Sequence, residues 1–430
     1  MLERLFQLKA HNTTVRTEIL AGVTTFLTMA YILFVNPNML AETGMDHGAV
    51  FVATCLAAAI GSLVMGLLAN YPIALAPGMG LNAFFTYTVV MTMGYSWQTA
   101  LGAVFLSGAI FFLLSIFKIR EWIINSIPLA LRAGIAAGIG LFLAIIALKN
   151  AGIVVDHPAT LVGLGDMSKG GALLACLGFF VIAALAYRKV TGAVMIGILL
   201  VTGLSIALGL SELPGVISMP PSLMPTLLQL DIAGALDIGL ISVIFAFLFV
   251  DLFDTSGTLV GVAQKADLLD KDGKMPRLGQ ALLADSTATM AGAALGTSTT
   301  TSYIESAAGI SAGGRTGLTA CVVAALFLLS LFFAPLAGSV PAYATAPALL
   351  FVAVLMMSSL AQIDWDDLTV AAPVVVAALA MPLTFSIANG IAFGFIAWTG
   401  IKLLSGRARE LNAAMWVLSA LFIVKLAYFA

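Results

Sequence analysis

The chain has 430 residues, of which 61% are hydrophobic and only 9% are charged. Charged residues make up roughly a quarter of a typical water-soluble domain, so this composition excludes a soluble globular protein. The net charge of -2 is too small to indicate a nucleic-acid partner.

Apolar segments recur from one end of the chain to the other, and about twenty apolar residues are needed to cross a bilayer as a helix. The pattern predicts a polytopic membrane protein with fourteen membrane elements, followed by a C-terminal segment whose relation to the membrane stays open. The fifteen segments are 17–35, 49–69, 73–94, 98–117, 128–148, 171–187, 192–210, 238–262, 278–295, 299–311, 316–337, 345–361, 368–385, 387–404 and 412–428.

These segments divide the chain into five parts. A polar N-terminal tail (1–16) precedes seven elements (17–210), a connecting loop (211–237) separates them from seven more (238–404), and a hydrophobic segment (405–430) ends the chain. Seven is an odd number, so a second half with the same order of elements enters the membrane the other way up.

Lys and Arg positions predict the orientation, because positive residues gather on the cytosolic side of membrane proteins. With the N-terminus in the cytosol, the loops and tails on that side carry nearly all of them. Among the residues before the C-terminal segment, only Lys149 and Lys169 fall on the other side. We therefore expect the N-terminus to lie in the cytosol.

Neither an ATP-driven pump nor an enzyme is expected. The sequence has no GxxxxGK[ST] phosphate loop, and its three cysteines lack the spacing of a metal site. The three histidines lie in polar or connecting stretches, where they cannot serve as a base inside the membrane. No cofactor is expected either.

Two segments are poor helix formers, and both occupy the third position of their half. The stretch 71–90 has two prolines and two glycines in its first part, while 297–303 is rich in serine and threonine. Broken backbone at membrane depth is tolerated where protein buries it or where it lines a cavity. Interrupted segments at matching positions of inverted halves are typical of a transporter's binding site.

Four acidic residues lie within apolar elements, where an ionised side chain costs several kcal/mol unless it faces a cavity, finds donors or is protonated. Asp251 and Asp254 share one face of the eighth element, and Glu305 on the tenth can face them. Asp285 is nearer a loop, where we expect a structural role. Such carboxylates could bind the N–H groups of a neutral ligand, a sodium ion or a proton.

Other polar residues are candidates for the same site. Asn82 in the third element carries an amide that both donates and accepts, beside two phenylalanines that are expected to be packing residues. Thr25 and Thr28 on the first element can reach the site, although threonine in a membrane helix commonly bonds its own backbone.

Three motifs give the chain a specific resemblance. "ALAPGMGLNAFF", "FVDLFDTSGTLVGVA" and "YIESAAGISAGGRTGLTA" resemble the AzgA-like purine nucleobase permeases, a branch of the nucleobase–ascorbate and xanthine–uracil transporter family, and the likeness covers essentially the whole chain. It implies an all-α fold of fourteen elements in two inverted repeats, divided into core and gate domains. It also implies short antiparallel strands and half-helices in elements three and ten, with the substrate bound at the core–gate boundary.

The resemblance also implies residue roles and a mode of transport. It places the substrate at Asp254, Glu305 and Asn82, with Thr25 ahead of Thr28 on the first element, and proton coupling at Glu305, Asp254 or Asp251. The eighth element lacks the histidine of the uracil and xanthine branches, so a proton path here runs through carboxylates and hydroxyls.

The expected function is therefore secondary active import of purine bases by proton symport, and the resemblance is compatible with a homodimer. The rival is an anion transporter of the same architecture, which should not place carboxylates beside its substrate. The sequence does not distinguish adenine from guanine or hypoxanthine.

Overall fold

The computed structural model describes residues 2–116, 127–265, 268 and 275–428. In the first half the elements are α1 (Leu2–Phe6), α2 (Val15–Met29), α3 (Ile32–Ala41), α4 (His47–Val64), η1 (Met65–Ala69), β1 (Leu75–Pro77), α5 (Met79–Ala83), η2 (Phe84–Thr92), α6 (Trp97–Ile116), α8 (Leu129–Asn150), β2 (Val154–His157), β3 (Leu161–Leu164), α9 (Gly170–Tyr187) and α10 (Ala193–Ala207).

In the second half the elements are α11 (Ile232–Ala235), α12 (Ile238–Lys265), α13 (Leu278–Leu295), β4 (Thr300–Ser302), α14 (Ser306–Ser311), α15 (Gly317–Ser330), η3 (Leu331–Phe333), α16 (Ala334–Gly338), α17 (Ala342–Met357), η4 (Ser358–Gln362), α18 (Leu368–Leu383), α19 (Ile387–Leu404), η5 (Ala408–Glu410) and α20 (Ala413–Tyr428). Within the described ranges, eight helices are long and apolar enough to cross a membrane. Four of the remaining predicted elements contain shorter apolar helices, namely 192–210, 238–262, 368–385 and 412–428. The element 278–295 corresponds to α13, and 73–94 and 299–311 are the two interrupted segments.

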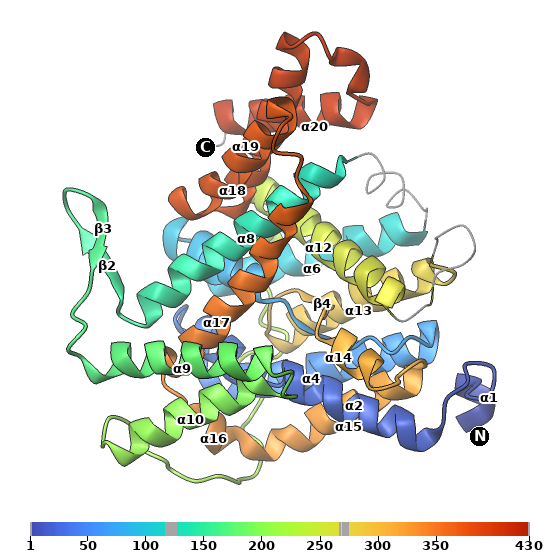
Figure 1. Ribbon diagram of the computed structural model, residues 1–430, viewed down its shortest axis with the longest axis vertical. Helices are drawn as coiled ribbons and strands as arrows, with labels where there is room; N and C mark the ends of the chain where they lie inside the picture. The colour runs from blue at the N-terminus through green and yellow to red at the C-terminus, as the bar shows by residue number, and fades with distance from the viewer. Residues whose placement is uncertain (1, 117–126, 266–267, 269–274, 429–430) are drawn as a thin grey trace.

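The helices pack as two bodies, which correspond to the expected core and gate. α2, α3, α4, α6, α12, α13 and α15 contact one another in the core, and α8, α9, α10, α17, α18 and α19 do so in the gate. Figure 1 shows α8, α9 and α17 on one side of the molecule and α2, α4 and α15 close together near its base. A large share of the buried side chains are alanine, so helices can approach closely.

The two interrupted elements meet in the middle of the core, where β1 pairs antiparallel with β4. Leu75 lies opposite Ser302 and Pro77 opposite Thr300, and each strand leads into a short helix. The prolines and glycines prevent a helix before α5, and the β-branched threonines favour an extended chain before α14. The strand pair satisfies the N–H and C=O groups that interrupted helices expose at membrane depth. The expected strands and half-helices are confirmed.

Two features were absent from the prediction. A hairpin of β2 and β3 projects from one edge of the molecule between α8 and α9 (Figure 1). α5 continues directly into the π-helix η2, and π-helical turns are frequent near functional sites.

One close helix contact in the core gives a stability prediction. A Cβ atom at Gly317 would lie 1.9 Å from the backbone oxygen of Gly66, which cannot move as a side chain can. We expect Gly317→Ala to destabilise the protein by about 1–3 kcal/mol, the usual cost of overpacking. Thermal unfolding of the purified protein in detergent measures this.

The matched control for that substitution is Gly203→Ala in α10. Gly203 is exposed, and an added Cβ meets nothing within 4 Å. Alanine favours a helix over glycine by up to about 1 kcal/mol, so this control should unfold at the same or a slightly higher temperature. Equal melting temperatures for the two variants would contradict the prediction.

Candidate functional site

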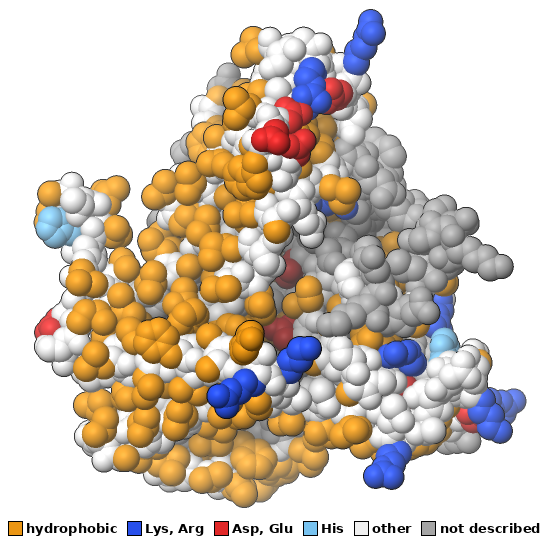
Figure 2. All heavy atoms as spheres, in the orientation of Figure 1, with side chains coloured by type: hydrophobic (Ala, Val, Ile, Leu, Met, Phe, Trp, Pro, Cys, Tyr) orange, Lys and Arg blue, Asp and Glu red, His pale blue; other side chains and the backbone are white. Residues whose placement is uncertain are grey.

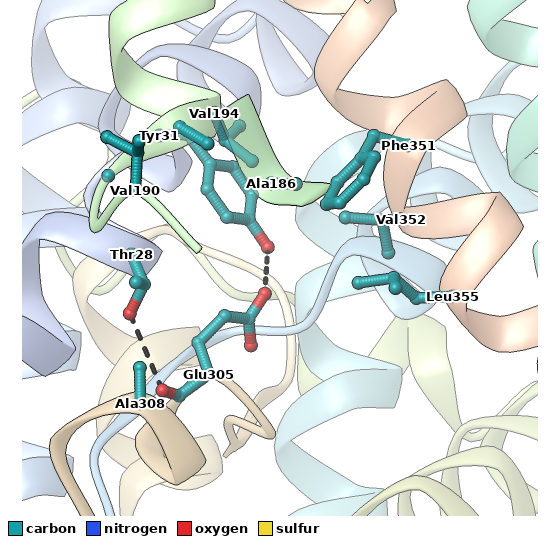
Figure 3. A pocket seen from close by; sticks show the side chains of 12 residues that line it. Thr28, Tyr31, Ala186, Val190, Val194, Glu305, Ala308, Phe351, Val352 and Leu355 are labelled. Carbon is teal, nitrogen blue, oxygen red and sulfur yellow. Dashed lines mark hydrogen bonds between the residues drawn. The ribbon is translucent and has the colours of Figure 1, made fainter. Parts of the chain in front are cut away.

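Glu305 stands at the junction between β4 and α14, where it is the N-cap residue of α14. Its side chain is half-buried. The hydroxyl of Tyr31 donates a hydrogen bond to Glu305 Oε1 at 2.6 Å, so the carboxylate is held toward the first element (Figure 3). Bonds to ionised acceptors are the strongest that a hydroxyl forms, and this one fixes the direction of the Glu305 side chain.

Beside this pair lies a cavity of about 220 Å³. Its walls come from both bodies, because α2, α14 and Tyr31 belong to the core, while α17 and the turn between α9 and α10 belong to the gate. The lining residues are Thr28, Tyr31, Ala186, Val190, Gly192, Ala193, Val194, Glu305, Ala308, Phe351, Val352 and Leu355. Figure 2 shows acidic side chains set back in a hollow, with apolar side chains along its left side.

The polar groups that line this cavity belong to the core, and the side chains that the gate contributes are apolar. Phe351, Val352 and Leu355 of α17 face the Tyr31 hydroxyl and the Glu305 carboxylate (Figure 3). This division suits a flat ligand with a hydrogen-bonding edge and an apolar face.

Asp254 lies near Glu305 but is not among the cavity-lining residues. Its charge interacts with those of Asp285 and Glu305, and the hydroxyl of Thr301 on β4 hydrogen-bonds to it. A Cβ at Gly78 would come within 3.7 Å of Asp254 Oδ2, so the carboxylate reaches the start of α5. The acids of the eighth and tenth elements therefore lie close together in the core.

Asp285 and Asp251 converge on one hydroxyl. Thr255 Oγ1 lies 3.0 Å from both carboxylate oxygens of Asp285 and 3.3 Å from Asp251 Oδ1. Asp285 also accepts hydrogen bonds from the backbone N–H and the hydroxyl of Ser302 at 3.1 and 3.2 Å. Asp285 thus connects β4 to α12, and Asp251, which is 2% exposed, lies one helical turn before Asp254.

The three other predicted residues differ in position. Thr28 lines the cavity, and its hydroxyl donates to Thr25 O at 2.7 Å and to Glu305 O at 3.4 Å. Thr25 is buried against Gly309 of α14 and does not line the cavity. Asn82 is fully buried outside the cavity lining, and neither atom of its amide has a hydrogen-bond partner among the described residues.

Tyr31 and the α17 residues of the cavity were not predicted from the sequence. Tyr31 could have been found, because it follows Thr28 by three positions and so lies on the same side of the first element. Phe351, Val352 and Leu355 have no such signal, since they belong to an ordinary apolar helix. Only the packing of α17 against the core shows which of its faces borders the site.

Comparisons with known proteins agree on the family. A family model described as the Permease family, the xanthine–uracil permease model, matches residues 16–393. The adenine permease AdeP of Escherichia coli is 52% identical over 428 residues, covering 100% of this chain and 96% of that protein. The guanine/hypoxanthine permease PbuG of Bacillus subtilis is 47% identical over 440 residues, covering 100% and 99%.

Solved structures are similar in fold. The transmembrane domain of the cyanobacterial bicarbonate transporter BicA superimposes with a TM-score of 0.67 at 15% identity, covering 87% of this chain and 96% of that one. At that identity the likeness concerns the arrangement of the helices alone. It supports the division into core and gate.

Proposed function

The chain belongs to the xanthine–uracil permease family and is a multi-pass membrane transporter, not an enzyme; from this premise we propose that it imports purine nucleobases across the bacterial cytoplasmic membrane by proton symport. The observation that carries the proposal is Glu305, a carboxylate that faces a cavity between core and gate and has a second carboxylate, Asp254, nearby. Relatives named for adenine and for guanine/hypoxanthine support the purine class without favouring one base.

In this proposal the two carboxylates have different tasks. Glu305 lines the cavity, so it accepts hydrogen bonds from the N–H groups of the base, whose ring packs against Phe351. Asp254 lies behind the cavity and takes up the proton, which removes a charge that would otherwise oppose closure. The core can then move against the gate and expose the base to the cytosol.

An anion is the less favoured substrate, although the fold is shared with a bicarbonate transporter. Carboxylates beside an anion repel it, and the described residues that line the cavity include Glu305 but neither Lys nor Arg. The acidic site therefore favours a neutral substrate that donates hydrogen bonds.

Uptake of radiolabelled adenine and hypoxanthine tests the proposal, in cells that lack their own purine permeases. We expect accumulation that unlabelled purines block, that bicarbonate and sulfate leave unchanged, and that a protonophore abolishes. Competition by the anions alone would overturn the substrate class. Accumulation that survives the protonophore would overturn proton coupling.

Tyr31→Phe tests how the Glu305 carboxylate is oriented. Removing the hydroxyl leaves Glu305 free to rotate away from the cavity, so the KM for the purine should rise about tenfold while the maximal rate stays within twofold. A hydrogen bond to a charged group contributes about 1.5–3 kcal/mol, which corresponds to at least that factor. Initial rates of uptake over a range of purine concentrations measure both constants.

The control is Tyr343→Phe in α17, since the Tyr343 hydroxyl also forms a half-buried hydrogen bond, to Ser205, away from Glu305. This variant should keep the KM of the unmodified protein. A KM that is unchanged in Tyr31→Phe as well would show that Tyr31 does not orient the site.

A further inference from the structure

Glu18 of α2 is a buried carboxylate that lies outside the candidate site. It is 0% exposed and accepts three hydrogen bonds from the region where α15 begins. The donors are the backbone N–H groups of Arg315 and Thr316 at 2.9 and 3.3 Å and the hydroxyl of Thr319 at 2.6 Å. A carboxylate here is stabilised by the free N–H groups and the positive end of the α15 dipole.

Arg315 extends this junction to the half-helix α14. Its Nη1 atom donates to the backbone oxygens of Ile310 and Gly314 at 2.8 and 2.7 Å. Ile310 is in the last turn of α14, so the guanidinium caps the carbonyl end of that helix. Gly313, with φ of +106°, lets the chain turn between α14 and α15. Glu18 thus fixes the Arg315 backbone, and Arg315 fixes the end of α14.

The clamp formed by Glu18 and Arg315 holds the two segments that meet at the site. α14 has six residues, so only about 9 Å of helix separates the clamp from Glu305. Along its length α14 packs directly on α2, because a Cβ at Gly309 would lie 2.5 Å from the Ala21 backbone oxygen. The first element begins beside the clamp and continues to Tyr31, which bonds Glu305. Figure 1 shows α2, α14 and α15 close together.

We propose that Glu18 is a positioning residue for transport, which holds α14 against α2 so that Tyr31 and Glu305 meet at the cavity. A six-residue helix has too few internal hydrogen bonds to be stable alone, so its place depends on its two ends. The pairing of β4 fixes one end, and Glu18 with Arg315 fixes the other. The effect on uptake rests on the proposed function, whereas the effect on α14 does not.

The first test follows backbone hydrogen exchange in residues 306–311 of the purified, substrate-free protein. In Glu18→Gln the amide group has one acceptor atom where the carboxylate has two. Exchange in α14 should therefore become at least tenfold faster, with a smaller increase in Glu18→Asp, which keeps the charge, and in Thr319→Val, which removes one donor. Unchanged exchange of α14 in Glu18→Gln would overturn the proposal, whatever the substrate is.

The second test compares purine uptake in Glu18→Gln with uptake in Glu18→Gln combined with Tyr31→Phe. Glu18→Gln alone should raise the KM about tenfold. With Tyr31→Phe already present, the further increase should be under twofold, because both changes disturb the same pair. Equal increases in the two backgrounds would show a general loss of structure and overturn the positioning role.

Asp46→Ala is the control, since Asp46 caps α4 through a hydrogen bond from Ala49 N at 2.7 Å and alanine cannot accept this bond. It should lower the melting temperature without changing the KM or the exchange of α14. If the unmodified protein takes up no purine, the proposed function fails while the exchange experiment still decides the role of Glu18.

Discussion

Glu305→Gln is expected to reduce the kcat/KM of purine uptake by at least about 100-fold and to abolish exchange of internal for external purine. The glutamine is nearly the same size, but it offers one neutral acceptor where the base meets an ionised carboxylate. Two hydrogen bonds to a charged group contribute about 1.5–3 kcal/mol each, and each 1.36 kcal/mol corresponds to a tenfold change in rate. Uptake and counterflow in membrane vesicles measure the two effects.

Glu410→Gln provides the control for that substitution. Glu410 is an exposed carboxylate that pairs with Lys402 and Arg407 far from the cavity, so its loss should leave uptake within twofold. The unmodified protein, Glu305→Gln and Glu410→Gln must be present in equal amounts and have the same melting temperature. Unchanged accumulation with unchanged pH dependence in Glu305→Gln would remove Glu305 from the site.

Asp254→Asn should separate proton coupling from binding. Asparagine resembles a permanently protonated aspartate, so the loaded carrier can still close, but no proton travels with the base. Purine exchange should remain within about threefold of normal, while accumulation driven by a pH gradient should fall to equilibration. Counterflow with no gradient and net uptake with an imposed gradient provide the two measurements.

Asp366→Asn serves as the comparison, because Asp366 is an exposed loop carboxylate and its loss should change neither measurement. If Asp254→Asn loses both purine exchange and purine accumulation, Asp254 binds the base directly. Gradient-driven accumulation that persists would place the coupled proton elsewhere, with Asp251 as the next candidate.

The sequence predicted the membrane elements well because each depends on a local property, the length of an apolar run. The two interrupted elements could be predicted from the sequence equally well, since Pro77 and the threonines before Tyr303 act on their own backbone. Their pairing, and the strands themselves, came from the family resemblance. The β2–β3 hairpin was not predicted, because its short strands lie in a loop with mixed composition.

The sequence could indicate only some residues of the candidate site. Glu305 and Asp254 were identified because carboxylates are costly inside a membrane, and this cost is visible in the sequence. The placement of Asn82 and Thr25 away from the cavity was not visible, because it depends on helix rotation and on contacts such as that between Thr25 and Gly309. For the same reason the hydrogen bonds between Glu18, near the start of a predicted element, and the start of α15 could not be predicted from the sequence.

The antiparallel pair of β1 and β4 also has a consequence for biosynthesis. The Tyr303 hydroxyl bonds the oxygen of Pro77 across 226 residues of sequence, so the first strand is made long before its partner. At about 5–20 residues per second, ribosomes need roughly 10–45 s to supply the missing segment. Until then the nascent first half holds unpaired peptide groups inside the lipid, and a chain truncated before β4 should be a target for quality-control proteases.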